Sequence, residues 1–307
     1  MLSANYLLLF LLGAIWGASF LLIKIGIAEI APMTFALLRI AIGAVTTALV
    51  LAIGRQRLPR ERRTWGHLAV MGLLGIGIPY AAISWGTQYI PSSLSAILNG
   101  MMPIFTFLVV VIMGSERFTL RRLVGVILGF AGTAVLVLPQ LTAGGLQASV
   151  LGSLAVILAA LSYAVAAVYA KRYVSHLPYQ IATFGQLALA ALMLLPLAIA
   201  EPSWRAELTM RSVGSLLFLG TVSTALAYLI YYRLIREAGA TFTSLVTYIS
   251  PPFGVFWGRL ILNEPITWNV IAALGLILVG LLLVRVAPRS PRPVPQSVPE
   301  DPVCAST

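Results

Sequence analysis

Residues 6–27 read YLLLFLLGAIWGASFLLIKIGI, and Lys24 is the only charged side chain in this stretch. A helix of that length is about 30 Å long, which matches the hydrocarbon core of a bilayer. No basic segment precedes the stretch, and no small-residue cleavage site follows a short apolar run, as a cleavable signal peptide would require. Residues 6–27 are therefore predicted to form a retained transmembrane helix.

The same pattern recurs along the chain. Segments of about 20 mostly apolar residues, the length that spans a bilayer, lie at 6–27, 33–53, 66–86, 93–113, 119–138, 150–170, 180–200, 212–232, 241–262 and 266–285. These runs are continuous and lack the alternation that marks the strands of a membrane barrel. The sequence predicts an all-α integral membrane protein with ten transmembrane helices joined by short connections.

The composition excludes an ordinary soluble protein. Of the 307 residues, 60% are hydrophobic and 9% are charged, whereas soluble domains carry about 25% charged residues. The mean hydropathy is +0.97, so lipid must solvate much of the surface and the bilayer is the predicted partner. We attribute the net charge of +11 to membrane topology and expect no nucleic-acid partner. Cys304 is the only cysteine, which excludes an intramolecular disulfide.

Basic residues gather on one side of the predicted helices. Loops 2–3, 4–5, 6–7 and 8–9 and the C-terminal flank carry Arg55, Arg57, Arg60, Arg62, Arg63, Arg117, Arg121, Arg122, Lys171, Arg172, Arg233, Arg236, Arg285, Arg289 and Arg292. The opposite side has only Arg205 and Arg211. The positive-inside rule predicts a multi-pass protein of the inner or plasma membrane with both termini in the cytoplasm. Residues 287–307 are rich in proline and are predicted to be a disordered cytoplasmic tail.

The two halves of the chain resemble each other. A shift of 148 residues aligns helices 3–5 with helices 8–10 without a gap and pairs Gly72 with Gly220, Tyr80 with Tyr228, Pro103 with Pro251, Phe105 with Phe253, Glu116 with Glu264, Thr119 with Thr267 and Gly132 with Gly280. Because each half has five helices, the second half enters the membrane upside down. We expect two inverted repeats, residues 1–140 and 141–286, as in many secondary transporters, whose substrate site lies near the midplane.

Several motifs add a family resemblance. They are Trp16-Gly17-Ala18-Ser19-Phe20 before Lys24, Pro32 before Arg39, Pro103 before Glu116, and Ala240-Thr241-Phe242, Pro251 and Glu264-Pro265 in the second half. With these motifs, residues 5–285 resemble the EamA family of the drug/metabolite transporter superfamily. The resemblance implies export of amino acids and other small metabolites from bacterial cells. The second half departs from the pattern, because Gly185-Gln186 occupies the place equivalent to Arg39.

Arg39 is the first candidate for a binding residue. It lies seven residues beyond Pro32, which places it about 10 Å inside the second helix. An ionisable group at that depth is costly and is a functional candidate by default. The alternative is that its long side chain extends to the outer interface or binds carbonyl groups at a helix end. Lys24 lies nearer its helix end, where extension toward the interface is expected.

Five aromatic residues with a polar atom lie inside helices and are predicted to line a cavity with Asn99 and Ser250: Trp16, Tyr80, Tyr163, Tyr228 and Tyr248. The alternative is an aromatic belt at the membrane interface. Pro103 and Pro251 are predicted hinges, because each removes a backbone donor at an equivalent position of the two halves. Ordinary packing is the alternative for both prolines.

Other features are predicted to be structural. Gly125, Gly129 and Gly132 give the fifth helix a small-residue face, continued by Ala273 and Gly280 on the tenth, and such faces let helices approach closely. Glu116 and Glu264 are predicted to cap the fifth and tenth helices, where a carboxylate suits the positive helix end.

The missing motifs and residue types narrow the function. The sequence has no HExxH, P-loop or GxSxG motif, so we expect neither an enzyme nor an ATP-driven pump, and no cofactor or metal. Every glutamate falls in a loop, at a helix end or in the tail, so no buried acid is available for a proton relay. The favoured function is a secondary transporter or exporter of small polar metabolites, with amino acids as the first class, acting as a monomer or homodimer. Efflux of lipophilic drugs and a non-transporting sensor or assembly factor stay open as alternatives.

Overall fold

The computed structural model describes residues 2–113, 119–142, 148–201, 207–238, 240–243 and 245–284. Every secondary-structure element within those ranges is helical. The elements are α1 Leu2–Gly26, α2 Pro32–Ile53, α3 Arg62–Gly72, η1 Leu73–Gly77, α4 Ile78–Gly86, α5 Ser92–Asn99, α6 Met102–Ile112, α7 Leu120–Thr142, α8 Ala148–Tyr173, α9 Tyr179–Ala200, α10 Met210–Phe218, η2 Leu219–Leu226, α11 Ala227–Ala238, α12 Ala240–Thr243, α13 Val246–Leu262 and α14 Trp268–Val284. The predicted tail, 287–307, lies outside the described residues.

Each of the ten predicted segments is mainly helical where it is described, and eight helical stretches are long and apolar enough to cross a membrane. Three of these stretches combine several elements: α3, η1 and α4 form one, α5 with α6 forms another, and α10, η2 and the first part of α11 form the third. α13 and α14 have 17 residues each and are not among these eight stretches. The all-α membrane fold is therefore confirmed, with eight candidate spans in the described ranges.

Two π-helical segments, η1 and η2, interrupt the third and eighth predicted helices. Under the 148-residue shift, Leu73–Gly77 maps onto 221–225, which falls inside η2. Both segments are continuous with the α-helices that flank them, so each widens its helix without breaking it. Single π-turns inside α-helices are frequent at functional sites. The two halves thus share a local irregularity as well as a residue pattern.

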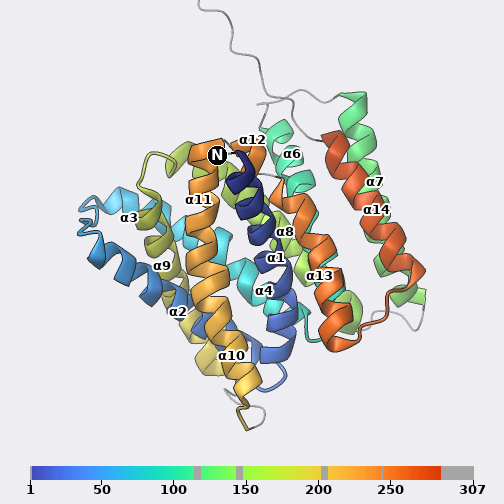
Figure 1. Ribbon diagram of the computed structural model, residues 1–307, viewed down its shortest axis with the longest axis horizontal. Coiled ribbons are helices and arrows are strands. Elements are labelled where there is room, and N and C mark those ends of the chain that lie inside the picture. Colours follow the sequence, from blue (N-terminus) through green and yellow to red (C-terminus); the bar gives the residue numbers. More distant parts are fainter. Residues whose placement is uncertain are drawn as a thin grey trace, which may run out of the picture.

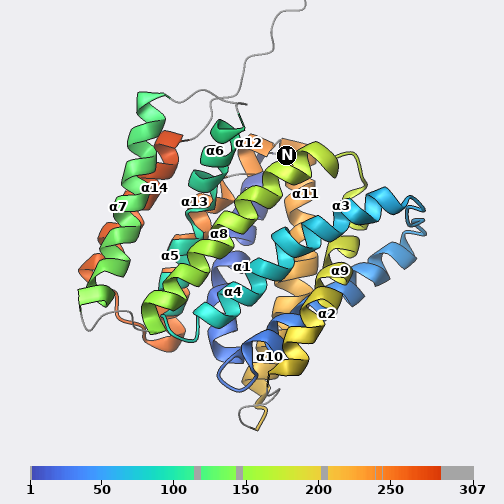
Figure 2. The same ribbon diagram turned by 180° about the vertical axis from the view of Figure 1, so that it is seen from behind.

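α7 and α14 lie side by side at one edge of the molecule, and α2, α3 and α9 lie at the opposite edge (Figures 1 and 2). A methyl group added at Gly125 would lie 2.7 Å from the backbone oxygen of Gly280, and one added at Gly280 would lie 2.6 Å from that of Gly125. One added at Gly132 would lie 3.0 Å from the oxygen of Ala273. These contacts leave no room for larger side chains, so the predicted small-residue face is a packing surface between the two helices.

Two glutamates accept hydrogen bonds from the N-termini of helices that are distant in the sequence. Glu264 accepts from the backbone nitrogens of Ser92 and Ser93 on α5, at 2.7 and 3.0 Å. Glu201 accepts from Met33 N on α2 at 2.8 Å. The prediction that Glu264 caps its own helix, α14, is therefore wrong, because the carboxylate turns toward N–H groups of the first half that have no partner within their own helix. Glu116 lies outside the described residues.

Candidate functional site

Arg39 on α2 is the starting point of the candidate site. Its side chain is 6% exposed, and its Nε donates a hydrogen bond to Thr224 Oγ1 on η2 at 3.3 Å. Its guanidinium carbon lies 4.1 Å from the centre of the Tyr80 ring on α4, which is within the range of a cation–π interaction. Arg39 thus points into the helix bundle, and the alternative of extension to the outer interface is excluded for it in this structure.

Close approach of α2 and η2 brings Thr224 within reach of Arg39. A methyl group added at Gly220 would lie 2.5 Å from Ile42 Cγ2 and 3.2 Å from the backbone oxygen of Arg39. One added at Gly43 would lie 2.9 Å from Thr224 Cγ2. Because both glycines lack a side chain, the two backbones pack against each other and the short threonine side chain is sufficient to meet the guanidinium group.

Aromatic residues surround this pair. Tyr163 and Tyr228 pack against the apolar cluster that contains Tyr80. The ring of Trp16 on α1 lies 6.2 Å from that of Tyr228 and 5.6 Å from that of Tyr231. Its indole nitrogen donates to the backbone oxygen of Ser223 on η2 at 3.2 Å. The structure therefore brings five predicted residues into one region: Trp16, Arg39, Tyr80, Tyr163 and Tyr228.

The other predicted binding residues make different contacts. Tyr248 donates its hydroxyl to the backbone oxygen of Leu281 at 2.8 Å and so ties α13 to α14. The backbone oxygen of Ser250 lies 2.7 Å from where a methyl group at Gly17 would be, which packs α13 against α1. Asn99 ends α5, and its buried Oδ1 has no hydrogen-bond partner among the described residues.

The two predicted hinge prolines differ in their surroundings. Pro103 lies in the first turn of α6, directly after a break between α5 and α6 at Gly100 and Met101. Pro251 lies inside α13, which is continuous from Val246 to Leu262. It packs against the first break, because Pro251 Cγ would lie 2.9 Å from a methyl group at Gly100. The interruption of the second half therefore falls before α13, and the helix runs through Pro251.

Sequence reasoning missed Thr224, Ser223 and Tyr231. Ser223 is 1% exposed and its hydroxyl has no hydrogen-bond partner in the described part of the chain, and Thr224 is fully buried. No local signal marks a π-helix, because residues 219–226 have the composition of an ordinary membrane helix. The only available clue was the small polar run Thr221-Val222-Ser223-Thr224 in an otherwise apolar segment.

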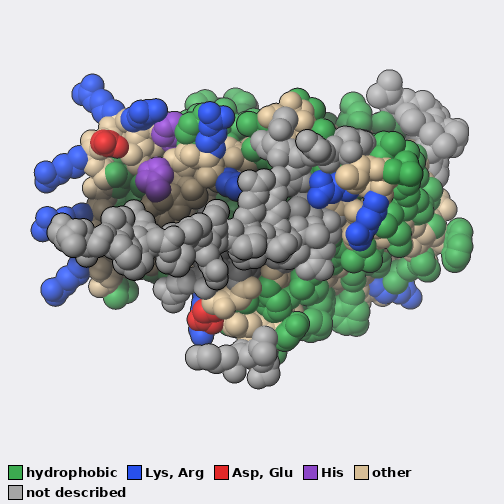
Figure 3. Space-filling model, turned by 90° about the horizontal axis from the view of Figure 1, so that it is seen from above, with side chains coloured by type: hydrophobic (Ala, Val, Ile, Leu, Met, Phe, Trp, Pro, Cys, Tyr) green, Lys and Arg blue, Asp and Glu red, His purple; other side chains and the backbone are tan. Residues whose placement is uncertain are grey.

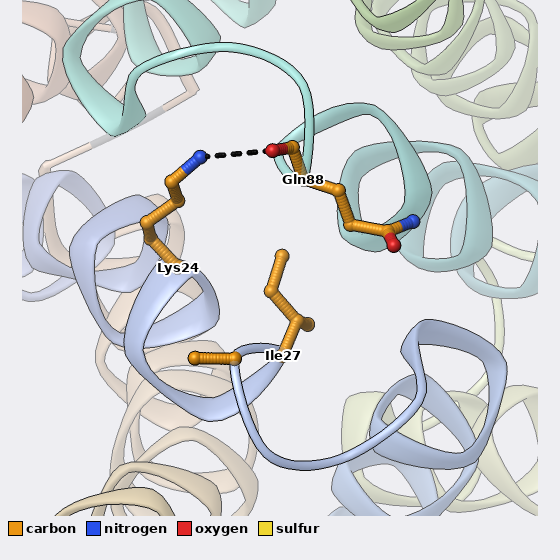
Figure 4. A pocket seen from close by; sticks show the side chains of 4 residues that line it. Lys24, Ile27 and Gln88 are labelled. Atoms are coloured by element: carbon orange, nitrogen blue, oxygen red, sulfur yellow. Dashed lines mark hydrogen bonds between the residues drawn. The ribbon is translucent and has the colours of Figure 1, made fainter. Parts of the chain in front are cut away.

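Lys24 lies at the other end of α1 and binds carbonyl groups. Its Nζ donates to the backbone oxygens of Thr87, Gln88 and Ile90 at 2.7, 3.2 and 2.9 Å, and Figure 4 shows it directed at Gln88. The expected extension toward the interface is thus replaced by a tie between α1 and the segment that joins α4 to α5. Unpaired carbonyls at a helix end are strong acceptors for such a cation.

A cavity of about 800 Å³ opens beside Lys24 and is lined by Lys24, Ile25, Ala28, Glu29, Arg211, Ile261, Leu262 and Glu264. Three of its charged groups already bind protein groups, because Lys24 binds carbonyls, Glu264 caps α5 and Glu29 caps α10. Hydrogen bonds from Ser212 and Thr209 hold the pKa of Glu29 below its ordinary value. We therefore place the candidate binding site at Arg39, whose charge lacks a counter-ion among the described residues, and assign this cavity to the helix ends.

The opposite end of the molecule carries many basic side chains, together with the histidine side chains (Figure 3). His67 Nδ1 lies 2.7 Å from the hydroxyl of Tyr169, and its ring stacks on Tyr173 with centroids 4.9 Å apart. These contacts pack α3 against α8. Within the described ranges, no three histidine, cysteine or acidic side chains lie close enough together to hold a metal ion.

The sequence profile of the EamA-like transporter family matches residues 4–138 and 150–286. An "Uncharacterized transporter YoaV" of Bacillus subtilis is 31% identical over 271 residues, which cover 88% of this chain and 92% of that protein. An "Uncharacterized inner membrane transporter YedA" of Escherichia coli K12 is 24% identical over 277 residues, covering 90% and 89%.

A solved crystal structure has the same fold, with a TM-score of 0.64, 20% identity, and coverage of 92% of this chain and 97% of that one. The two family matches fall on the two predicted halves and leave only a short connection between them. Together with the apolar helices, they identify a multi-pass membrane transporter. The chain belongs to the EamA-like transporter family of the drug/metabolite transporter superfamily.

Proposed function

We propose that this chain is a secondary transporter that moves small polar metabolites, with amino acids as the first class, across the cytoplasmic membrane by alternating access. The observation that carries the proposal is a matched pair of contacts between the halves. Gly220 on η2 packs against the backbone oxygen of Arg39 on α2, and Gly72, the last residue of α3 before η1, packs against the backbone oxygen of Gln186 on α9. Gln186 belongs to the pair Gly185-Gln186 that occupies the place equivalent to Arg39, and the matched contacts make Gln186 its counterpart.

This reciprocity supports two inverted five-helix repeats. In each case a helix from one half packs on a glycine of the other half that lies in a π-segment or directly before one. If the halves are related by a two-fold axis in the membrane plane, exchanging their conformations opens the site to the other side of the membrane. The site lies where the halves meet and consists of Arg39, Thr224 and the surrounding aromatic residues.

The absence of a buried acid favours a neutral or zwitterionic solute over a lipophilic cation. Among the buried residues that the structure describes, Arg39 is the only charged one. Binding of lipophilic cations and proton relays usually requires an intramembrane carboxylate. We infer that transport is facilitated diffusion, or is coupled to protons by a route other than a buried acid.

Counterflow in proteoliposomes tests this function. Purified protein is reconstituted, the vesicles are loaded with 5 to 10 unlabelled amino acids in turn, roughly at millimolar concentration, and entry of the labelled amino acid is measured. We expect counterflow for at least one of them, and an imposed pH gradient then distinguishes facilitated diffusion, which it leaves unchanged, from proton coupling. Vesicles without protein are the control. Absence of counterflow for every amino acid, or proton-driven exchange of a quaternary ammonium dye, would overturn the proposal.

The proposed orientation, with both termini in the cytoplasm, needs a separate measurement. After Cys304→Ser, single cysteines are introduced at the exposed positions Arg60 and Glu207. An impermeant thiol reagent added to sealed cells should label the cysteine at 207 and leave the one at 60 unlabelled until the cells are opened. Labelling at 60 in sealed cells would reverse the topology.

A further inference from the structure

We infer that the transported solute carries a carboxylate group and that Arg39 is its binding partner. The inference rests on the proposed function, because it assigns a substrate class to the same site. It follows from the charge of the site, from its free hydrogen-bond donors and from the comparison with the equivalent position, Gln186.

The charge of Arg39 has no counter-ion among the residues that the structure describes. The guanidinium is buried, and its contacts are the Thr224 hydroxyl and the face of Tyr80. A buried charge is strongly destabilising unless it is paired with an opposite charge and hydrogen-bonded. A hydroxyl and an aromatic face compensate only part of that cost, so binding of an anionic ligand at Arg39 is electrostatically favourable.

The donors that remain at the site fit a carboxylate. A guanidinium group has five N–H donors in a planar fork, and only Nε has an acceptor within the described ranges. Thr224 Oγ1 accepts from Arg39, so its own proton is free to be donated. Ser223, the preceding residue on η2, has a buried hydroxyl that no described group pairs with. A carboxylate matches the fork in a bidentate manner.

The single positive charge of the site favours a ligand with one carboxylate over a phosphate dianion. Arg39 is the single charged side chain among the described buried residues, so the site neutralises one negative charge. Tyr80 covers one face of the guanidinium, which leaves its edges for the ligand. Trp16, Tyr163 and Tyr228 offer apolar ring surface for the rest of a small organic acid.

Gln186 argues against a purely structural role for the arginine. α9 packs on η1 as α2 packs on η2, with Gly72 in the place of Gly220. That contact forms with a neutral side chain at the position equivalent to Arg39. Since the framework assembles without a cation in one half, packing alone does not explain the cation in the other.

The experiment compares acids with their amides on the full-length protein in detergent. The probes are L-leucine with L-leucinamide and 4-methylpentanoate with 4-methylpentanamide, and the readout is the unfolding temperature, since a ligand of the folded state stabilises it. We expect the acid of each pair to stabilise at a concentration at least about tenfold lower than its amide. Equal potency of the two acids would show that the carboxylate alone is recognised; a preference for leucine would add recognition of the ammonium group, and both outcomes support the inference.

Variants assign the effect to Arg39. Arg39→Gln, which copies the residue of the second half, should abolish the preference for acids. Thr224→Val keeps the shape, removes the hydroxyl and should weaken the preference. Arg259→Gln, at an exposed position near the end of α13, is the matched control and should retain it. Equal stabilisation by acids and amides, no stabilisation by either acid, or an unchanged preference in Arg39→Gln would overturn the inference.

The two proposals fail in different ways. Counterflow without a preference for acids over amides would support transport and overturn the inference that Arg39 binds a carboxylate. A preference for acids that depends on Arg39, without counterflow in proteoliposomes, would support the carboxylate site and overturn the proposed transport of amino acids.

Discussion

The two π-segments have the same neighbours in the two halves, but only one of them meets a charge. η2 contacts α2 and hydrogen-bonds to the buried Arg39 through Thr224. η1 contacts α9, where the neutral Gln186 places its Oε1 3.7 Å from the position of a methyl group added at Gly75. The main difference between the two regions is therefore chemical, since corresponding helices pack on the two π-segments.

A backbone oxygen of each π-segment also accepts a hydrogen bond from a side chain on a neighbouring helix. Trp16 on α1 donates to the backbone oxygen of Ser223 on η2. Ser162 on α8, at the position nearly equivalent to Trp16, donates to the backbone oxygen of Leu74 on η1 at 2.7 Å. A π-turn leaves a carbonyl without its usual partner in the helix, and a side chain supplies the missing donor.

The comparison teaches that a duplicated framework can carry a single asymmetric site. Glycine contacts and carbonyl ties are present in both halves, so we assign them to the scaffold of the fold. The charge of Arg39 and the indole of Trp16 belong to the first half only. Substitutions in the scaffold should therefore affect stability in both regions, whereas substitutions at Arg39 should affect binding and transport.

The largest expected effect is loss of flux when the charge is removed. Arg39→Gln should lower counterflow of the best amino acid by about 100-fold, because truncating one partner of a buried charge pair typically costs 2–5 kcal/mol. The double variant Arg39→Gln/Gln186→Arg moves the charge to the equivalent position and should recover part of the flux. Counterflow at the wild-type rate in Arg39→Gln would show that the charge does not distinguish the two regions in function.

Added methyl groups at the glycines should cost stability in both regions. We expect Gly72→Ala and Gly220→Ala each to lower the free energy of unfolding by about 1–3 kcal/mol. Gly72→Ala should cost more, because it meets the Gln186 oxygen at 2.8 Å and the Ala190 nitrogen at 3.1 Å, whereas Gly220→Ala first meets the Ile42 side chain. A backbone contact relaxes only if a whole helix moves.

Unfolding temperatures in detergent measure this effect. Gly214→Ala and Gly275→Ala are the controls, because no described atom lies within 4 Å of the added group, and they should leave stability unchanged or raise it by up to about 1 kcal/mol. Equal stability of all four variants would show that the glycine contacts do not hold the halves together.

The helical segments could be predicted from sequence, because hydropathy records them directly, whereas the inverted repeat stays a prediction. The segment 93–113, for example, is found as α5 and α6, Ser92–Ile112. Arg39 was identified by its depth in an apolar run. The π-segments could not be predicted, since a small change in backbone dihedral angles leaves no mark on composition. The cap of α5 by Glu264 was also missed, because the two groups lie 172 residues apart in the chain.

A smaller effect is expected when the carbonyl ties are removed. Ser162→Ala and Trp16→Phe each delete one donor and should each lower the free energy of unfolding by about 1 kcal/mol. Trp16→Phe keeps an aromatic ring beside Tyr228, so the stability lost in this variant reports mainly on the hydrogen bond. Ser175→Ala, which removes an exposed bond to the Lys171 oxygen, is the control and should be nearly neutral. A clear loss in only one of the two regions would show that the ties are not equivalent.

The smallest effect concerns the helix ends that precede the π-segments. α10 leads into η2 and is capped from a distant turn by Glu29, which accepts from Thr209 N and Thr209 Oγ1 at 2.8 Å each and from Ser212 Oγ. α3 leads into η1 and has Glu61 at its N-cap position, where the carboxylate accepts from Thr64 Oγ1 at 3.1 Å and caps no backbone N–H group of α3. The Glu29 cap of α10 therefore joins separate parts of the chain, and the Glu61 contact at α3 is local.

The pH dependence of stability tests the Glu29 cap of α10. Hydrogen bonds from Ser212 and Thr209 lower the folded-state pKa of Glu29 below its ordinary value of 4.5. A lowered pKa means that the folded state binds the proton more weakly than the unfolded state, so the stabilisation is present above pH 4.5 and is lost as the pH falls through the lowered value. The difference in unfolding temperature between the wild type and Glu29→Gln should therefore shrink on acidification below that pH. It should also shrink in about 1 M salt, because an exposed carboxylate is screened. A difference that stays constant through the acid range would show that the Glu29 charge does not stabilise α10.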